Sequence, residues 1–168
     1  MKVVIDTDIL SMFAKVDGIG ILMDFFGSGR AVMTPSIRDE ISIPLQYGYA
    51  FPNSVLSQIH VIPLSGQAWE EHERLRTIGA SLGKGELEAV AICKTEGMLF
   101  ATNDVIARKF AQDQGVQVIS LQAILRGIWQ SGLRSKAEVR ELLERVRKAD
   151  NLEVAPEVEI EIFGEGEE

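Results

Sequence analysis

Two acidic residues follow the first apolar run of the chain, in the opening sequence MKVVIDTDIL. Asp6 and Asp8 carry the carboxylate oxygens that bind divalent cations or transfer protons. Asp is also common where a strand simply turns into a helix. A carboxylate at the carboxyl end of a first strand, however, lies where open α/β sheets form their ligand sites. The other acids of the chain decide between these two interpretations.

Three further acids stand at comparable positions. Glu40 lies in the helical pattern after the second apolar run, Glu86 lies in GKGELEAVAI, and Asp104 follows the fourth run in FATND. Because parallel strands all end at one edge of their sheet, we expect these acids to lie beside Asp6. Carboxylates within about 4–6 Å repel one another unless a cation joins them. An oxygen-only set of this kind favours Mg²⁺ or Mn²⁺ over Zn²⁺.

Acids near helix starts also have a simpler explanation, because their charge interacts favourably with the helix dipole. This explanation stays open for each of the three later acids taken singly. Asp8 is a further candidate, either as an additional metal ligand or as a helix cap. Two neighbouring acids, Asp39 and Glu88, are predicted to face solvent, because residues one or two apart on a helix point in different directions.

Five short apolar runs predict the strands that position these acids. Nearly continuous apolar runs are typical of strands that are covered on both faces, and helical patterns separate them. The chain is therefore predicted to form a three-layer αβα fold with a parallel sheet of about five strands. The runs are KVVI at 2–5, AVMT at 31–34, HVIPL at 60–64, LFAT at 99–102 and VQVIS at 116–120.

The predicted domain comprises residues 1–133. The chain has 168 residues, of which 46% are hydrophobic, which suits one domain with a sizeable core. An amphipathic helix within residues 134–152 is predicted to pack on this domain, and residues 153–168 form an acidic tail. Residues 42–56, with two prolines, are the segment expected to be an irregular loop or lid.

In the tail, Glu alternates with Val158, Ile160 and Ile162, which is the period of a strand with one apolar face. Such a strand could join the edge of a sheet and hold its acids over the substrate groove, as an autoinhibitor or as the occupant of a partner's site. The alternative is a disordered, solubilising end.

The net charge of −8 arises mostly in this tail, because residues 1–152 contain 18 acids and 17 bases. An acidic composition therefore does not exclude a polyanionic substrate. The single cysteine, Cys93, lies in an apolar stretch, which excludes a disulfide framework and favours a core position. No apolar stretch is long enough to span a membrane, and the first residues leave no room for a signal peptide. We therefore expect a cytoplasmic protein with no membrane partner.

An ordered set of motifs resembles the PIN-domain nucleases, and most closely the prokaryotic relatives of VapC-type toxins. The motifs are DTDIL, TPSIRDEI, LGKGELEAVAI, ATNDVIARKFA and GVQVISLQAIL. The resemblance implies an Mg²⁺- or Mn²⁺-dependent endoribonuclease that cuts single-stranded RNA. In that family Ser or Asn is common where this chain has Asp8, and Thr102 corresponds to the hydroxyl that steadies the last acid at the substrate site. The catalytic and metal-binding acids implied are Asp6, Glu40, Glu86 and Asp104.

Basic residues stand beside these acids in the sequence. Lys84, Arg108 and Lys109 are candidates to bind a substrate phosphate, and the alternative is that they are ordinary solvated charges. A homodimer is expected because Phe25, Phe26 and Trp129 exceed what a small domain must bury. The resemblance implies the same, since PIN-domain nucleases commonly pair. For a toxin it also implies an antitoxin protein as a partner.

Two other functions stay open at this point. DTDIL also matches the Asp-x-Asp start of haloacid-dehalogenase-like phosphatases, although TND supplies only one acid where that family needs a late acidic pair. The other is a non-catalytic PIN-like scaffold that binds RNA or a protein. Nothing in the sequence specifies an RNA target, because RNA recognition depends on loop shape and unstacked bases.

Overall fold

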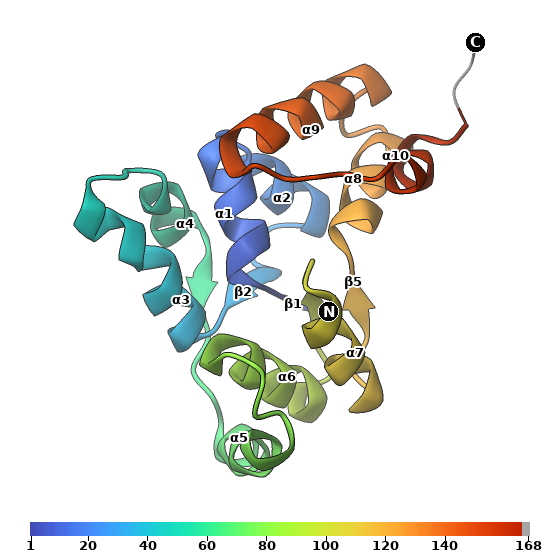
Figure 1. Cartoon of the computed structure of the whole chain (residues 1–168). Coiled ribbons are helices and arrows are strands. Elements are labelled where there is room, and N and C mark those ends of the chain that lie inside the picture. Colours follow the sequence, from blue (N-terminus) through green and yellow to red (C-terminus); the bar gives the residue numbers. More distant parts are fainter. Residues whose placement is uncertain (166–168) are drawn as a thin grey trace.

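A parallel five-stranded sheet lies at the centre of the fold. The computed structural model describes residues 1–165 (Figure 1). The strand order is β3-β2-β1-β4-β5, and all neighbouring strands are parallel, which confirms the predicted fold class. The chain moves outward from β1 first to one edge and then to the other, so the carboxyl ends of β1 and β4 form the switch point of the sheet. The strands are β1 (Val3–Ile5), β2 (Ala31–Met33), β3 (His60–Val61), β4 (Leu99–Ala101) and β5 (Val118–Ile119).

Helices connect the strands and cover both faces of the sheet. In Figure 1, α1, α2, α8 and α9 lie above the sheet, whereas α6 and α7 lie below it and α5 packs on the outer side of α6. None of the helices within residues 1–165 combines the length and the apolar content needed to cross a bilayer. Their bounds are α1 (Thr7–Lys15), α2 (Ile19–Phe26), α3 (Pro35–Ser42), the 3₁₀ helix η1 (Ile43–Tyr47), α4 (Pro52–Gln58), α5 (Gly66–Ile78), α6 (Lys84–Glu96), α7 (Val105–Asp113), α8 (Leu121–Gln130), α9 (Lys136–Asp150) and α10 (Pro156–Phe163).

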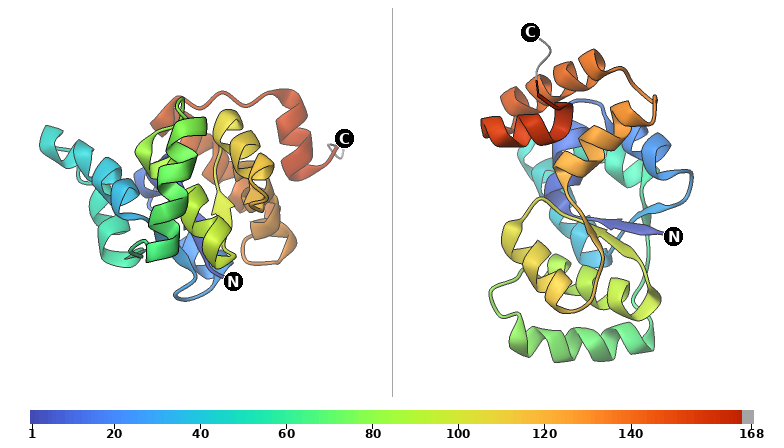
Figure 2. Two further views of the ribbon diagram at one scale, coloured as in Figure 1. Left: turned by 90° about the horizontal axis from the view of Figure 1, so that it is seen from below. Right: turned by 90° about the vertical axis from the view of Figure 1, so that its right-hand side faces the viewer.

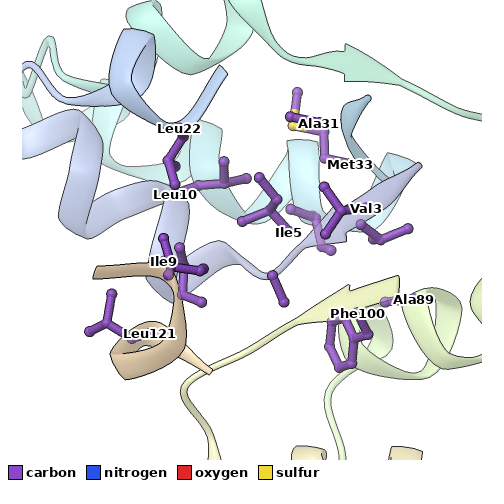
Figure 3. Packing of buried hydrophobic residues seen from close by; sticks show 14 of the residues in the cluster. Val3, Ile5, Ile9, Leu10, Leu22, Ala31, Met33, Ala89, Phe100 and Leu121 are labelled. Carbon is purple, nitrogen blue, oxygen red and sulfur yellow. The ribbon is translucent and has the colours of Figure 1, made fainter. Parts of the chain in front are cut away.

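The sheet and the two helical layers share one apolar core. Figure 3 shows Val3 and Ile5 of β1 close to Leu10 and Leu22 of the upper helices, with Phe100 of β4 beside the lower layer. All five side chains are 2% exposed or less. Strands buried on both faces need continuous apolar runs, which is why short runs in the sequence identified them. The single cysteine is also buried, as expected.

The last helices pack on the same body. α9 contacts α1, and the chain then returns beneath α9 to α10, which lies against α8 (Figures 1 and 2). The prediction of a strand in the tail is wrong, because Pro156–Phe163 is helical. The prediction of an irregular segment at 42–56 is also wrong for most of its length, since η1 and the start of α4 occupy it.

Candidate active site

Asp6 lies at the switch point, directly after β1. Its carboxylate begins α1, and Oδ1 accepts a hydrogen bond from the backbone N–H of Thr7 at 2.8 Å. Oδ2 accepts from the hydroxyl of Thr102, which follows β4, at 2.9 Å. Only 4% of Asp6 is exposed. The first acid is therefore a buried carboxylate held between the ends of two neighbouring strands.

Thr102 connects this acid to the next one. The backbone N–H of Asp104 donates to the Thr102 hydroxyl oxygen at 3.1 Å, and Asp104 caps α7 by accepting from the backbone N–H of Ala107 at 2.8 Å. Thr102 itself is fully buried. It therefore fixes the positions of Asp6 and Asp104 from beneath, and it has no surface with which to contact a substrate directly.

The Glu40 side chain extends from α3 to the first residues of α1 and α6. Its Oε2 accepts from the hydroxyl of Thr7 at 2.6 Å, and its Oε1 accepts from the backbone N–H of Gly85 at 3.3 Å. A Cβ atom on Gly85 would lie only 2.8 Å from Oε1 of Glu40 and 3.0 Å from Cγ1 of Ile37. A side chain at residue 85 therefore fits only if the Glu40 carboxylate and the Ile37 side chain shift.

Glu86 completes the set at the first turn of α6. Its Oε2 accepts from the backbone N–H of Gly83 at 3.0 Å, which is the reciprocal half of a capping box. The simpler explanation for acids at helix starts thus applies in part. Asp6, Asp104 and Glu86 each satisfy N–H groups at the start of a helix, and these bonds also fix the position of each carboxylate.

The acids act on one another electrostatically. The pKa of Asp6 is raised from 3.8 to about 7. Burial is the largest cause, and the charges of Glu86 and Asp8 act in the same direction, whereas hydrogen bonds from Thr102 and Thr7 lower the pKa. Burial, followed by the charges of Asp104 and Glu40, likewise raises the pKa of Glu86. The parallel topology has therefore brought acids from four distant segments within range of mutual repulsion.

Asp8 belongs to the same group although it is exposed. Partial loss of water around its carboxyl group raises its pKa, as do the nearby charges of Asp150, Asp104 and Glu40. Asp150 comes from the end of α9 and forms an ion pair with Lys15. Sequence reasoning missed Asp150, because no local pattern indicates that α9 packs along α1.

Within residues 1–165, no three Asp, Glu, His or Cys side chains converge closely enough to hold a metal ion in this conformation. The geometry explains this, since Glu40, Glu86 and Asp104 are turned toward hydrogen-bond donors of their own. The donor set nevertheless fits a hard cation, because it consists only of carboxylate oxygens whose mutual repulsion a cation relieves. Mg²⁺ and Mn²⁺ are the ions that such donors suit.

Comparison with known families agrees with this arrangement. Residues 2–167 match a family model described as a PIN domain. The chain belongs to the PIN-domain family. Proteins of this family are typically nucleases, and the phosphatase alternative therefore no longer applies. A search of curated protein sequences gave no match.

The PIN match includes α9 and α10, so it extends past residue 133. The expected division of the chain at that residue stays a prediction, and so does the specific relationship to VapC-type toxins.

The position of Glu88 in this PIN domain differs from the prediction. Glu88 was predicted to face solvent, but it is 1% exposed. Its carboxylate accepts from the backbone N–H of Ser36 at 3.0 Å and from the Thr34 hydroxyl at 3.3 Å, at the first turn of α3. It therefore joins α6 to the helix that carries Glu40. Asp39 does face solvent, with 73% of its side chain exposed.

The basic candidates lie on α6 and α7, close in sequence to Glu86 and Asp104. Lys84 and Lys109 are exposed, and Arg108 is half-buried one turn after Asp104 on α7. Within residues 1–165 none of the three forms an ion pair. Their charges are thus free of carboxylate partners in the part of the chain that the structure describes.

Thr7 was also missed as a site residue. It follows Asp6 directly, and its hydroxyl holds the Glu40 carboxylate at 2.6 Å. A hydroxyl beside an acid at a helix start is too common to indicate such a role in sequence alone.

Proposed function

We propose that this PIN domain is an Mg²⁺- or Mn²⁺-dependent endoribonuclease that hydrolyses phosphodiester bonds of single-stranded RNA. The observation that carries the proposal is the buried Asp6 carboxylate at the switch point, whose hydrogen-bonded partner Thr102 also fixes Asp104. A fold does not by itself imply a function, but this set of side chains supplies the acids that metal-assisted hydrolysis needs.

Four acids would hold the metal, with Asp8 as an additional candidate. When bound, the cation would stabilise negative charge on the phosphate and promote ionisation of the attacking water. To bind the cation together with Asp6, the Glu40 and Glu86 side chains would have to rotate away from their present hydrogen-bond donors, and both are partly exposed. Asp6 is fixed by its own hydrogen bonds. The four ligands proposed are Asp6, Glu40, Glu86 and Asp104.

The remaining site residues position the substrate or the acids. Lys84, two residues before Glu86 at the start of α6, and Arg108, four residues after Asp104 on α7, are proposed to bind phosphates of the RNA. Thr102 acts through Asp6 and Asp104, since it is buried beneath both.

Cleavage of purified single-stranded RNA tests the proposal, with Mg²⁺, with Mn²⁺ and with a chelator. We expect the wild type to cut only with metal and Glu40→Gln to lose at least about a hundredfold in rate, as losses of essential acid–base or electrostatic groups do. Asp39→Asn is the matched control, because Asp39 lies beside Glu40 on α3 but faces solvent.

Two results would contradict the proposal. Cleavage that persists in the chelator, or equal rates for Glu40→Gln and Asp39→Asn, would remove the acids from catalysis. RNA binding without any cleavage in the presence of metal would instead favour the non-catalytic scaffold.

We propose in addition that the protein forms a homodimer and, if it is a toxin, binds an antitoxin protein. The aromatic residues that first suggested a dimer pack within the chain, since Phe25 lies against Gly127 and Trp129 donates to the Ile162 carbonyl at 2.7 Å. A different surface supports the proposal: Val105 and Ile106 are 65% and 64% exposed beside Asp104. Light scattering should give twice the chain mass, and a monomer up to high-micromolar concentration would overturn the dimer.

A further inference from the structure

A groove lies between the second half of α1, the segment from η1 to the start of α4, and the end of α9. Its volume is about 500 Å³, and pockets for small ligands usually measure roughly 300–1,000 Å³. α1 contacts both α4 and α9 (Figure 1). The groove is therefore large enough for a single nucleotide. The residues that line it are Ser11, Lys15, Pro44, Tyr49, Phe51 and Ala149.

This groove begins beside the acids of the candidate active site. Asp8, Ser11 and Lys15 share one face of α1, because they are three and then four residues apart. Lys15 forms an ion pair with Asp150, which directly follows the lining residue Ala149. After partial loss of water, the charge of Asp150 is the largest cause that raises the pKa of Asp8, and the charge of Lys15 acts against it. A strand that leaves the acids along α1 therefore enters the groove.

The wall opposite α1 carries exposed aromatic rings. Tyr49 is 61% exposed, and its ring centre lies 6.4 Å from that of Phe51. Tyr47, two residues earlier, is 75% exposed. Aromatic faces of this kind stack with the unpaired bases of single-stranded nucleic acids, and every base has a face that can stack. The wall thus suits an unpaired strand without selecting one base over another.

Lys15 provides the positive charge that a phosphate needs. Its Nζ lies 5.3 Å from the centre of the Phe51 ring. An ammonium group has three N–H donors, and within residues 1–165 the hydrogen bond to Asp150 uses one of them. A phosphate oxygen can therefore bind Lys15 while the ion pair stays in place. A cation beside aromatic rings is the combination that binds single-stranded nucleic acids.

The connection of the groove to the acids favours RNA over a partner protein as its occupant. The aromatic wall follows α3, the helix that carries Glu40, because η1 begins at the next residue. The opposite wall is the face of α1 that carries Asp8. An RNA strand bound at the acids has to continue past them, and it would meet this groove on the way.

We propose that the groove binds an unpaired nucleotide that flanks the scissile phosphate of the RNA. The base stacks on Tyr49, and Lys15 binds the phosphate of the same nucleotide. A base in a duplex is already stacked and paired, so the groove explains why the strand must be single. The inference rests on the proposed function for its substrate, and it goes further by assigning the aromatic segment a role in binding.

Binding of short fluorescent oligonucleotides to the metal-free protein tests the groove without cleavage. We expect Tyr49→Leu, which keeps an apolar side chain but removes the ring, to weaken binding of a single-stranded RNA at least about fivefold. Tyr49→Phe is the matched control, because it keeps the ring, and it should bind like the wild type. A duplex of the same sequence should bind equally to all three proteins, since its bases cannot stack on the ring.

A second variant tests the phosphate contact separately. Lys15→Gln should reduce the slope of log affinity against log salt concentration by about 0.7, which corresponds to one phosphate on a single strand. Lys148→Gln is the matched control, because it removes the same charge at an exposed position of α9 next to Ala149. This control should leave the slope unchanged.

Three results would overturn the groove as an RNA site. They are equal RNA affinity of Tyr49→Leu and Tyr49→Phe, an unchanged salt slope in Lys15→Gln, and no binding by the wild type up to high-micromolar concentration. Each would favour a partner protein as the occupant instead. Weaker binding by Tyr49→Leu without RNA cleavage by the wild type would leave the groove standing and refute the nuclease. Cleavage with the same KM in Tyr49→Leu and Tyr49→Phe would do the reverse.

Discussion

At the scale of single residues, the topology brings the acids together and hydrogen bonds fix where each carboxylate lies. The alternation of strands and helices places Asp6, Glu40, Glu86 and Asp104 at one edge of a parallel sheet whatever the details of packing. Hydrogen-bond partners such as Thr7 depend on side-chain positions that differ by a few ångströms. The sequence contains no local signal for them.

The Asp6 carboxylate should make the metal-free protein less stable as the pH rises. Its pKa is about 7 in the folded protein against an ordinary 3.8, so the folded state binds more protons than the unfolded state between these values. The free energy of unfolding therefore falls as pH rises through this window and is lowest above it. Asp6→Asn removes the charge, and we expect this variant to be more stable than wild type by roughly 2–4 kcal/mol near pH 8.

Urea unfolding at a series of pH values measures this effect. The gain of Asp6→Asn should shrink toward pH 4, where wild-type Asp6 is protonated in the folded state and about half protonated in the unfolded state. Asp39→Asn, whose side chain is exposed, should show no such pH-dependent gain. A gain in Asp6→Asn that is the same at pH 4 and pH 8 would mean that the charge is not its source.

Gly85 both packs against α3 and donates its backbone N–H to the Glu40 carboxylate. Gly85→Ala should reduce the stability by about 1–3 kcal/mol and impair cleavage, because the added methyl group would displace the Glu40 carboxylate 2.8 Å away. The matched control is Gly20→Ala, since Gly20 is likewise the second residue of its helix and has nothing within 4 Å of the added atom. This control should gain about 0.5–1 kcal/mol from helix propensity. A stabilised Gly85→Ala variant would contradict the close contact.

At the scale of elements, periodicity predicted the strands and failed where a helix has no solvent face. The residues from Leu87 to Cys93 in α6 are all buried, because α3, α5 and the sheet surround the helix. The rule that residues two apart on a helix face different ways is correct, but here both directions lead into protein. Glu88 was therefore wrongly expected to face solvent.

Glu88 should be essential for the placement of α3 against α6. Glu88→Ala leaves the Ser36 N–H and the Thr34 hydroxyl without their buried acceptor, and we expect a loss of about 2–4 kcal/mol in the free energy of unfolding. Glu88→Gln keeps a carbonyl oxygen and should lose about half of that or less. Glu96→Ala, an exposed site on the same helix, should change the stability by less than about 0.5 kcal/mol. Thermal and urea unfolding of the three variants make the comparison.

In the tail, apolar residues alternate with Glu as in a strand, but the segment forms the helix α10. Val158 and Ile162 are four residues apart and share the face of α10 that packs on the domain, whereas Ile160 between them is 48% exposed. The correct signals were the proline at the start and the glycine at the end of PEVEIEIFG. Alternation over so few residues fits both a strand and one helix face.

At the scale of the whole molecule, the C-terminal segment is part of the folded body. Ile162 and Phe163 are 1% and 3% exposed, and α10 contacts α8. The seven acids of residues 153–168 include Glu159, which pairs with Arg147 on α9. These contacts lie on the domain and neither form a strand nor pair with an edge of the sheet. Three of these acids, Glu157, Glu159 and Glu161, thus lie in a helix that packs on the domain.

Truncation after Leu152 should therefore destabilise the protein before it affects RNA access. Burial of a large apolar side chain contributes about 1.5–3 kcal/mol, so the loss of Ile162 and Phe163 together should cost roughly 3–6 kcal/mol as an upper estimate. Thermal unfolding of the truncated chain measures this, and Glu157→Gln, at an exposed position of α10, is the control that removes charge alone.

The competing expectation is an autoinhibitory tail, for which truncation would leave the melting temperature unchanged and tighten RNA binding, most strongly at low salt. Unchanged stability together with unchanged RNA binding would show that α10 contributes to neither.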